Sequence, residues 1–357
     1  MRILFLARRF YPEVGGVEKH VLEIGKRLVK KGHKVVVITE NSQKTHSDGK
    51  QSNPTSARMV GKVEGIEIYR INAGNNNWFK KFRIWRQLWK LRNTMSDCDV
   101  IHCHDVFFWY LPFRFLFPFK KVYTTFHGYE GNLIPGQKAI LMHKLSEKLS
   151  FGNICVGDFL AKWYGTKPTF ITYGAVDKSL IEQGSKFLKV TRDAMFLGRL
   201  EEETGIMEYL EALKILKDRK ISLELDVFGD GVQMDEAKKY VKEYELKVNF
   251  KGFVANAVDY IKDYKYVFVS RYLGILEAMA LQKPVFAQYN NEIKKDYLQM
   301  APFAKYISIA GDSGVISRAV SSYIGKKNLE VGRAYLWVKN ETWEKMVNLY
   351  LRLWTRQ

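Results

Sequence analysis

The sequence predicts an α/β protein made of two similarly organised halves. Short apolar segments rich in β-branched residues alternate with amphipathic segments, which is the pattern of parallel strands joined by helices. The chain has 357 residues, enough for two such domains, and 46% hydrophobic with 27% charged residues is typical of a globular protein. We expect the first domain at residues 1–174, the second at 175–340, and a final helix at 341–357 that crosses back to the first domain.

Composition narrows the class of protein. No run approaches the roughly 18 to 20 apolar residues of a membrane span. The three cysteines, Cys98, Cys103 and Cys155, have neither zinc-binding nor disulfide spacing, which favours a reduced cytoplasmic protein. The net charge of +19 lies mainly in the first half, where residues 1–175 hold 28 Lys and Arg against 13 Asp and Glu. Such a basic face suits anionic lipid, nucleic acid or a phosphorylated substrate, but no nucleic-acid-binding module is present.

A glycine pair follows the first predicted strand. Residues 2–7 read as that strand, Phe10–Gly16 as a loop, and Val17–Lys31 as an amphipathic helix. Gly15 and Gly16 let backbone N–H groups approach a phosphate or a sugar closely, and an ordinary turn is the alternative. His20 lies just inside the helix, at a position expected to face the surface.

The segment Asn77–Asn93 is both aromatic and basic. Its aromatic residues recur at helical spacing, at Trp78, Phe82, Trp85 and Trp89. Such a helix can lie in the interface of an anionic membrane. The alternative is a crossover helix that packs its aromatic stripe on the sheet. The next aromatic segment, Phe107–Phe119, contains two prolines and is predicted to be a packed connection.

Histidines mark the ends of two strands in the first half. Strand Asp99–Cys103 ends at His104-Asp105, at the carboxyl edge where α/β proteins bind ligands. His102 and His104 alternate with Cys103 and therefore share one face. Strand Lys121–Phe126 ends at His127, which we expect to point into the same crevice, with a purely structural histidine as the alternative.

Two aspartates in the first half resemble a metal-binding pair. Asp97 and Asp99 have the Asp-x-Asp spacing of such a site, but they precede a strand instead of following one. Carboxylates in turns are common, so no metal site is expected.

The second half carries groups suited to a phosphate. Arg199 follows strand Ala194–Leu197, and its planar fork can hold two phosphate oxygens. Thr204 can offer a hydroxyl or cap the next helix. Strand Ile221–Phe228 ends at Gly229, and strand Val248–Gly252 ends at Phe253.

A strand, a tight loop and a short helix occupy residues 264–287. Strand Tyr266–Ser270 is predicted to break at Ser270–Gly274, before a helix at Ile275–Gln282. The start of that helix would offer unpaired N–H groups to a phosphate. Glu277, in its first turn, can accept hydrogen bonds from sugar hydroxyls.

Five motifs resemble, in the same order, those of the GT-B glycosyltransferases of family 4. They are Gly15-Gly16, His127-Gly128, Gly198-Arg199-Leu200, Gly229-Asp230-Gly231 and Glu277-Ala278-Met279. The resemblance covers nearly the whole chain and implies two Rossmann-like domains facing a cleft. The chain departs from the family where Val269 stands for the first signature Glu and where Thr204 stands for the phosphate-binding Lys.

The resemblance also implies an activity. It is a retaining, metal-independent hexosyltransferase (EC 2.4) that needs no cofactor besides its nucleotide-sugar co-substrate. The acceptor would be a glycan or lipid-linked glycan in cell-envelope or polysaccharide biosynthesis. We expect a cytoplasmic location, with Asn77–Asn93 on the inner face of the cell membrane as an open alternative. Val269 and Thr204 leave a second interpretation open, a catalytically impaired nucleotide-sugar-binding or scaffold protein.

Site residues are implied in the same way. His127 would contact the donor sugar, Arg199 the diphosphate and Glu277 the ribose. The rest of the donor site would comprise Gly15, Gly16, Thr204, Gly229, Phe253, Gly274, Ile275 and Leu276. The acceptor side would include His20, His104 and Asp105.

Overall fold

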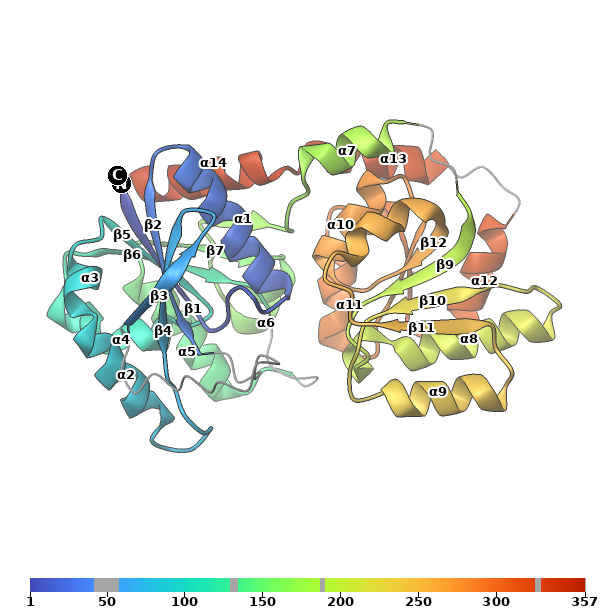
Figure 1. The fold of residues 1–357 in the computed structure, drawn as a ribbon, viewed down its shortest axis with the longest axis horizontal. Coiled ribbons are helices and arrows are strands. Elements are labelled where there is room, and N and C mark those ends of the chain that lie inside the picture. Colours follow the sequence, from blue (N-terminus) through green and yellow to red (C-terminus); the bar gives the residue numbers. More distant parts are fainter. Residues whose placement is uncertain (42–57, 129–133, 187–189, 325–328, 357) are drawn as a thin grey trace. The chain divides into compact units, whose positions relative to one another are not determined.

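The computed structural model describes residues 1–41, 58–128, 134–186, 190–324 and 329–356 (Figure 1). It separates into two compact units. The N-terminal unit comprises Met1–Glu130, Pro135–Thr172 and Trp343–Gln357, and the C-terminal unit consists mainly of Tyr173–Thr342. The last helix of the chain therefore belongs to the N-terminal unit.

The N-terminal unit is built on an eight-stranded sheet with the order β3-β4-β2-β1-β5-β6-β7-β8. The strands are β1 (Arg2–Ala7), β2 (Lys34–Glu40), β3 (Arg58–Val63), β4 (Ile66–Ile71), β5 (Val100–His104), β6 (Lys121–Phe126), β7 (Gly152–Val156) and β8 (Phe170–Thr172). All pairings are parallel except that of β3 with β4. Strand β1 lies between β2 and β5, so the strand order reverses there, and α/β sheets bind ligands at such a point.

Helices cover both faces of this sheet. They are α1 (Gly16–Lys30), α2 (Lys80–Lys90), α3 (Arg92–Ser96), α4 (Phe107–Leu116), α5 (Gln137–Leu149), α6 (Phe159–Tyr164) and α14 (Trp343–Thr355). Leu4 and Leu6 of β1 pack in one core with the buried residues of α2, α3 and α4. Phe5 points to the other face, where its ring lies 6.2 Å from that of Trp354 in α14. This alternation gives each side of the sheet its own core.

The C-terminal unit has a fully parallel six-stranded sheet with the order β11-β10-β9-β12-β13-β14. The strands are β9 (Arg192–Leu197), β10 (Leu225–Phe228), β11 (Val248–Gly252), β12 (Tyr264–Phe268), β13 (Val285–Gln288) and β14 (Ser308–Ala310). The α-helices are α7 (Lys178–Gly184), α8 (Ile206–Asp218), α9 (Met234–Glu243), α10 (Tyr272–Ala280), α11 (Glu292–Gln299), α12 (Ser313–Tyr323) and α13 (Leu329–Val338). Short 3-10 turns occupy Glu202–Thr204, Ala257–Asp263 and Ala304–Tyr306. Here the strand order reverses between β9 and β12.

Helix α10 begins at Tyr272, three residues earlier than predicted. The sequence suggested a break at Gly274, but this glycine lies inside the helix. A Cβ atom there would approach Cγ2 of Val269 to 2.7 Å, so the glycine permits close packing against the preceding loop. Glu277 consequently lies in the second turn of the helix, not in the first.

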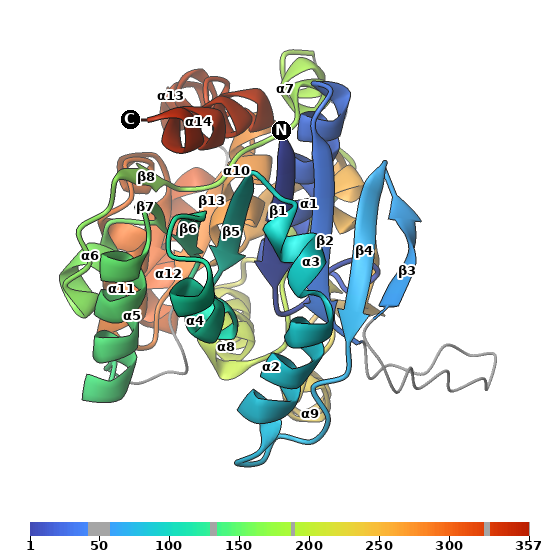
Figure 2. The same ribbon diagram turned by 90° about the vertical axis from the view of Figure 1, so that its left-hand side faces the viewer.

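The segment predicted to be a packed connection is instead the helix α4, with Pro112 inside it. Pro112 has no N–H to donate to the carbonyl oxygen of Phe108. That oxygen accepts a hydrogen bond from Nε1 of Trp85 in α2, at 2.9 Å. The proline therefore leaves an acceptor that joins α4 to α2, and the two helices lie side by side (Figure 2).

Helix α2 does not pack its aromatic stripe on the sheet. Its buried residues are Ile84, Gln87 and Leu88, whereas Phe82 and Trp89 are 55% and 52% exposed. The interpretation of this segment as a crossover helix with an aromatic core face was therefore wrong about which side faces the core. Within the described part of the chain, no helix combines the length and the apolarity needed to cross a bilayer.

Candidate functional site

The ends of β5 and β6 bring three predicted residues together. Nδ1 of His104 lies 2.9 Å from Nε2 of His127. Asp105 follows His104 with a left-handed backbone (φ 59°), and its Oδ1 accepts a hydrogen bond from the backbone N–H of His127 at 2.8 Å. Neighbouring parallel strands thus deliver His104, Asp105 and His127 to one point of the carboxyl edge.

His20 belongs to the same cluster, so a surface position for it is excluded. Its side chain is buried, and its ring centroid lies 4.7 Å from that of His127. Its Nε2 lies 2.8 Å from the hydroxyl of Tyr350, on α14. The local helical pattern could not reveal this burial, because the covering residue lies 330 positions away in the chain.

A hydrogen-bond chain runs from α14 through the sheet to His20. The indole Nε1 of Trp354 donates to Nδ1 of His102 at 3.0 Å, so a neutral His102 carries its proton on Nε2. That nitrogen lies 2.7 Å from Oγ1 of Thr125, which lies 2.8 Å from the hydroxyl of Tyr350. The hydrogen of Thr125 then goes to Tyr350, and the hydrogen of Tyr350 goes to Nε2 of His20. This arrangement places the remaining proton of His20 on Nδ1.

Burial keeps the histidines of this cluster neutral. Desolvation lowers the pKa of His20 to about 3 and lowers the pKa values of His102, His104 and His127 well below their ordinary value. Neighbouring histidines lower the last three further. These rings are therefore poor bases near neutral pH, and they are suited to orienting hydroxyl groups by hydrogen bonds.

The two glycines at the start of α1 differ in their surroundings. A Cβ atom on Gly15, the residue that precedes the helix, would collide with the carboxylate of Glu18. A Cβ atom on Gly16 would meet nothing within 4 Å. Packing among the described residues thus explains why position 15 is a glycine, but it does not explain why position 16 is one.

In the C-terminal unit, two arginines meet at the point where the strand order reverses. Arg199 follows β9 and Arg271 follows β12, and these strands are neighbours in the sheet. Nη2 of Arg199 lies 3.1 Å from Oε1 of Glu203, and Nη2 of Arg271 pairs with the same oxygen. Nη1 of Arg199 also pairs with Glu201 at 3.2 Å. Two guanidinium groups therefore converge on one carboxylate at the carboxyl edge.

Arg271 was missed in the sequence, although it lies between Val269 and Glu277 in the signature itself. A lysine, Lys294 of α11, lies near Arg271 and is buried, with Nζ donating to the carbonyl oxygen of Ser270. Burial, with Arg271 as a neighbour, holds the pKa of Lys294 well below its usual value. Arg271 thus brings a second guanidinium group next to Thr204, the position where the resembling family has a lysine.

Thr204 and Gly229 shape their loops. The hydroxyl of Thr204 donates to the carbonyl oxygens of Arg199 and Glu201, and it accepts from the backbone N–H of Glu201. Thr204 thus closes the short 3-10 turn Glu202–Thr204 in a capping box with Glu201, and it does not cap the next helix as expected, since α8 begins after Gly205 without a side-chain cap. A Cβ atom on Gly229 would collide with the carbonyl oxygen of Gly198, so this glycine permits the close approach of two loops.

The start of α10 differs from the predicted phosphate-binding end. The first helical amide, that of Tyr272, donates to the hydroxyl of Tyr297 at 2.8 Å, and Ile275 N–H donates to the carbonyl oxygen of Arg271 at 2.9 Å. Gly274, Ile275 and Leu276 are buried inside the helix. The prediction that Ile275 presents an unpaired N–H group was wrong, because the helix begins earlier than expected. Glu277 is buried in the same helix.

Two more residues lie near the carboxyl edge of this sheet. Phe253 follows β11 and is 62% exposed, which leaves its ring face accessible. Gln288 ends β13 and is fully buried, yet among the described residues its side-chain amide has no hydrogen-bond partner. That amide lies against Gly205, at the start of α8, where a helix has N–H groups to offer. No motif in the sequence pointed to Gln288.

The Asp-x-Asp pair has a structural role. Oδ2 of Asp99 accepts from the backbone N–H of Arg2 at 2.7 Å, and Asp97 pairs with Nη1 of Arg2 at 3.6 Å. Across the described ranges, no group of three or more His, Cys, Asp or Glu side chains is placed to hold a metal ion.

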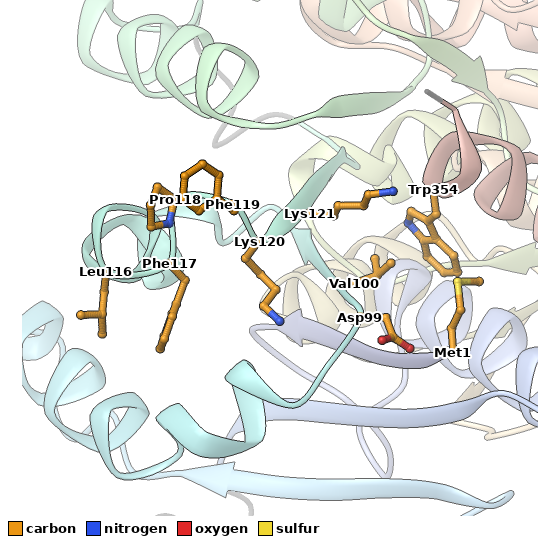
Figure 3. A pocket seen from close by; sticks show the side chains of 10 residues that line it. All are labelled: Met1, Asp99, Val100, Leu116, Phe117, Pro118, Phe119, Lys120, Lys121 and Trp354. Carbon is orange, nitrogen blue, oxygen red and sulfur yellow. The ribbon is translucent and has the colours of Figure 1, made fainter.

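A hollow of about 620 Å³ lies at the opposite, amino edge of the N-terminal sheet (Figure 3). Val100 and Lys121, the first residues of β5 and β6, line it, together with Phe119 and Trp354. The hollow therefore lies at the other ends of these two strands from His104 and His127, and Trp354, which lines it, donates a hydrogen bond to His102.

Family comparisons match both halves of the chain. Residues 14–167 match the model described as Glycosyltransferase Family 4, and residues 177–330 match that described as Glycosyl transferases group 1. Digalactosyldiacylglycerol synthase 2 of Glycine max is 27% identical over 127 residues, which is 36% of this chain and 27% of that protein. Digalactosyldiacylglycerol synthase 1 of Lotus japonicus is 30% identical over 107 residues, covering 30% and 13%. The matched regions thus span about a quarter or less of these relatives.

Solved structures share the fold over the whole chain. A glycosyltransferase from Rickettsia africae has a TM-score of 0.72 at 16% identity, covering 99% of this chain and 97% of that one. An Anabaena protein in complex with UDP and glucose has a TM-score of 0.68 at 13% identity, covering 98% and 97%. These likenesses confirm the predicted GT-B fold class of two Rossmann-like domains.

Proposed function

Because the chain belongs to the GT-B glycosyltransferases of family 4 and group 1, we propose that it transfers a sugar from a nucleotide-diphosphate sugar to an acceptor hydroxyl. The observation that carries this proposal is the convergence of Arg199 and Arg271 on Glu203, where the strand order of the C-terminal sheet reverses. Guanidinium groups bind phosphate oxygens in pairs and stabilise the charge that develops on a leaving diphosphate. An entering diphosphate would replace the carboxylate of Glu203 as the partner of the two arginines.

The remaining roles follow from the chemistry of each group. Glu277 would hold the ribose hydroxyls, and the exposed ring of Phe253 would lie against the base. In the N-terminal unit, His127 would orient the donor sugar through a hydrogen bond, since burial keeps it neutral. Gly16, with nothing within 4 Å of its Cβ position, would leave room for the sugar or a phosphate.

We propose a retaining hexosyl transfer that needs no metal ion. The bond between the anomeric carbon and the diphosphate oxygen breaks, and the acceptor oxygen bonds to the same face of that carbon. The acceptor proton passes to the leaving diphosphate, which balances the charge that forms there. The lowered pKa values of the histidines support this assignment of the base, because neutral rings with such low pKa values accept protons poorly.

The acceptor would be a glycan or a lipid-linked glycan of the cell envelope or of a polysaccharide. The names of the curated relatives, digalactosyldiacylglycerol synthases, support an acceptor attached to lipid. We therefore also propose that the protein works in the cytoplasm at the inner face of the cell membrane, where such an acceptor would be presented.

A second candidate function is a nucleotide-sugar-binding or scaffold protein with impaired catalysis. The engaged hydroxyl of Thr204 and the absence of a carboxylate at Val269 favour it, because both positions normally bind the donor in the resembling family. The two candidates differ in turnover, not in nucleotide binding.

A donor screen that measures released nucleoside diphosphate separates them. Transfer predicts release with at least one UDP-, GDP- or ADP-sugar in the presence of glycan or lipid-linked acceptors. It also predicts that Arg199→Ala and Arg271→Ala reduce the rate, while Arg333→Ala, an exposed arginine on α13, does not. Nucleotide binding without release over the whole panel would favour the scaffold.

A further inference from the structure

Two adjacent helices of the N-terminal unit expose an unusual number of large apolar side chains. Those of α2 and the residues just before it are Trp78, Phe79, Phe82 and Trp89, which are 52–82% exposed. Those of α4 and the loop after it are Phe115, Leu116 and Phe119, which are 46–92% exposed. We call these seven side chains the aromatic face. Removing these side chains from water would be favourable, and an exposed apolar surface of this size is typical of a site that binds a partner.

The two halves of the aromatic face belong to one surface. The indole Nε1 of Trp85 donates to the carbonyl oxygen of Phe108, and the Trp89 ring lies 6.3 Å from that of Phe113. Both contacts join α2 to α4, which lie side by side on one side of the sheet (Figure 2). Leu116 and Phe119 continue the surface to the rim of the hollow at the amino edge (Figure 3).

The two segments that carry this face are basic, although Glu40 pairs with Lys80 at the start of α2 and Asp99 lines the hollow. Residues 68–96 contain seven Lys and Arg and no Asp or Glu, and residues 106–128 contain three Lys and Arg and no Asp or Glu. On α2, Lys81, Arg86 and Lys90 are exposed between the aromatic side chains. Nζ of Lys81 lies 5.7 Å from the centre of the Phe108 ring, so cation and aromatic side chains are interleaved.

The mixture of aromatic and basic side chains favours a lipid bilayer as the partner of this face. Tryptophan and phenylalanine insert into the boundary between headgroups and acyl chains, while nearby Lys and Arg side chains reach the headgroup phosphates. Each basic residue near an anionic bilayer adds to the attraction. A protein partner with a complementary surface would need carboxylates placed between apolar groups, whereas an anionic bilayer supplies both everywhere.

We propose that the aromatic face of α2 and α4 docks on the surface of an anionic phospholipid bilayer. This inference deepens the proposed location at the membrane, but lipid binding can be measured without any sugar transfer. The sequence had suggested only Asn77–Asn93 for such a contact; the structure adds the face of α4. Because α2 and α4 are held together by Trp85 and Phe108, we expect the surface to bind as a rigid unit.

The test is sedimentation of the full chain with vesicles. We expect binding to vesicles of equal parts phosphatidylglycerol and phosphatidylcholine, little binding to pure phosphatidylcholine, and release at high salt. The double variants Phe82→Ala/Trp89→Ala and Arg86→Glu/Lys90→Glu should each weaken binding at least tenfold. The matched controls are Tyr260→Ala/Leu336→Ala and Lys238→Glu/Lys239→Glu, which change exposed residues of the same kinds in the C-terminal unit and should bind like the unchanged protein.

Several results would overturn the proposal. Equal binding to the two kinds of vesicle would show that anionic lipid is not what the face recognises. An equal loss of vesicle binding in the control variants would show that this face is not the binding surface. Self-association that the Phe82/Trp89 variant abolishes, without binding to vesicles, would assign the face to a second copy of the chain. If transfer fails for every donor but vesicle binding follows the pattern above, docking stands and the proposed catalysis falls.

Discussion

Replacing Tyr350 by phenylalanine tests how α14 holds the histidine cluster. The substitution removes one hydroxyl from a fully buried side chain and leaves the ring in place. Nε2 of His20 then loses its donor, and the hydroxyl of Thr125 loses its acceptor, both originally at 2.8 Å. A buried polar group left unpaired costs about 1–3 kcal/mol, and two groups lose a partner here, so we expect a loss of about 2–6 kcal/mol in the free energy of unfolding of the N-terminal unit.

Urea unfolding followed by tryptophan fluorescence measures this loss. Seven of the eight tryptophans belong to the N-terminal unit, so the signal reports mainly on that unit. With a slope of about 2 kcal/mol per molar urea, the midpoint should fall by about 1–3 M.

Tyr110→Phe is the matched control. Tyr110 is also fully buried in the N-terminal unit, but its hydroxyl has no hydrogen-bond partner among the described residues. Its removal should leave stability unchanged or raise it by about 1 kcal/mol. Equal midpoints for the Tyr350 and Tyr110 variants would refute the hydrogen-bond chain. Nitrogen NMR of the histidines gives an independent check, since we expect the proton on Nε2 of His102 and on Nδ1 of His20.

The glycine loop, the buried histidines and the ring of Phe253 each yield a separate prediction. Gly16→Ala should leave stability within about 0.5 kcal/mol, because a Cβ atom meets nothing within 4 Å, yet it should lower sugar transfer at least tenfold; a large loss of stability would show instead a structural role. Folding keeps His20 and His143 neutral, with pKa values lowered to about 3 and about 4, so the unfolded chain binds more protons below pH 6.5. The stability of the N-terminal unit should therefore fall as the pH decreases from 6.5 toward 4. Urea midpoints that do not change with pH over this range would contradict this prediction. All seven histidines lie between residues 20 and 143, so the C-terminal unit should not lose stability in the same way. Phe253→Ala should weaken nucleotide binding about 5- to 100-fold if its ring stacks on the base, without a change in unfolding, and unchanged affinity would exclude the stacking.

Local patterns predicted the parts of the fold that depend on neighbours in the sequence. The glycine loop, the helix α1 and the strand ends at His104 and His127 follow from alternation and from turn residues. Because carboxyl ends of parallel strands share one edge, the proximity of His104, Asp105 and His127 could also be anticipated.

The remaining features depend on tertiary contacts. His20 is buried because Tyr350 and its helix cover it from the far end of the chain. The outward direction of Trp89 follows from the buried Ile84 and Leu88, which compete with the aromatic side chains for the core and occupy it. Gly274 resembles a helix break in sequence, and only its contact with Val269 shows why a helix retains it.

Arg271 illustrates a different limit. It lies inside the signature, yet a comparison of motif positions draws attention to Val269 and Thr204, where expected residues are absent. The structure shows that a cation can be supplied from the end of a neighbouring strand, because β12 lies beside β9.

Calorimetric titration with UDP, GDP and ADP tests the central claim most directly, namely that Arg199 and Arg271 form a diphosphate site in the C-terminal unit. We predict that at least one nucleotide binds, that Arg199→Ala and Arg271→Ala each weaken binding about 10- to 100-fold, as expected for a charged hydrogen bond, and that Arg333→Ala binds like the unchanged protein. Binding of none of the three nucleotides, or equal loss in the Arg333 variant, would contradict the account.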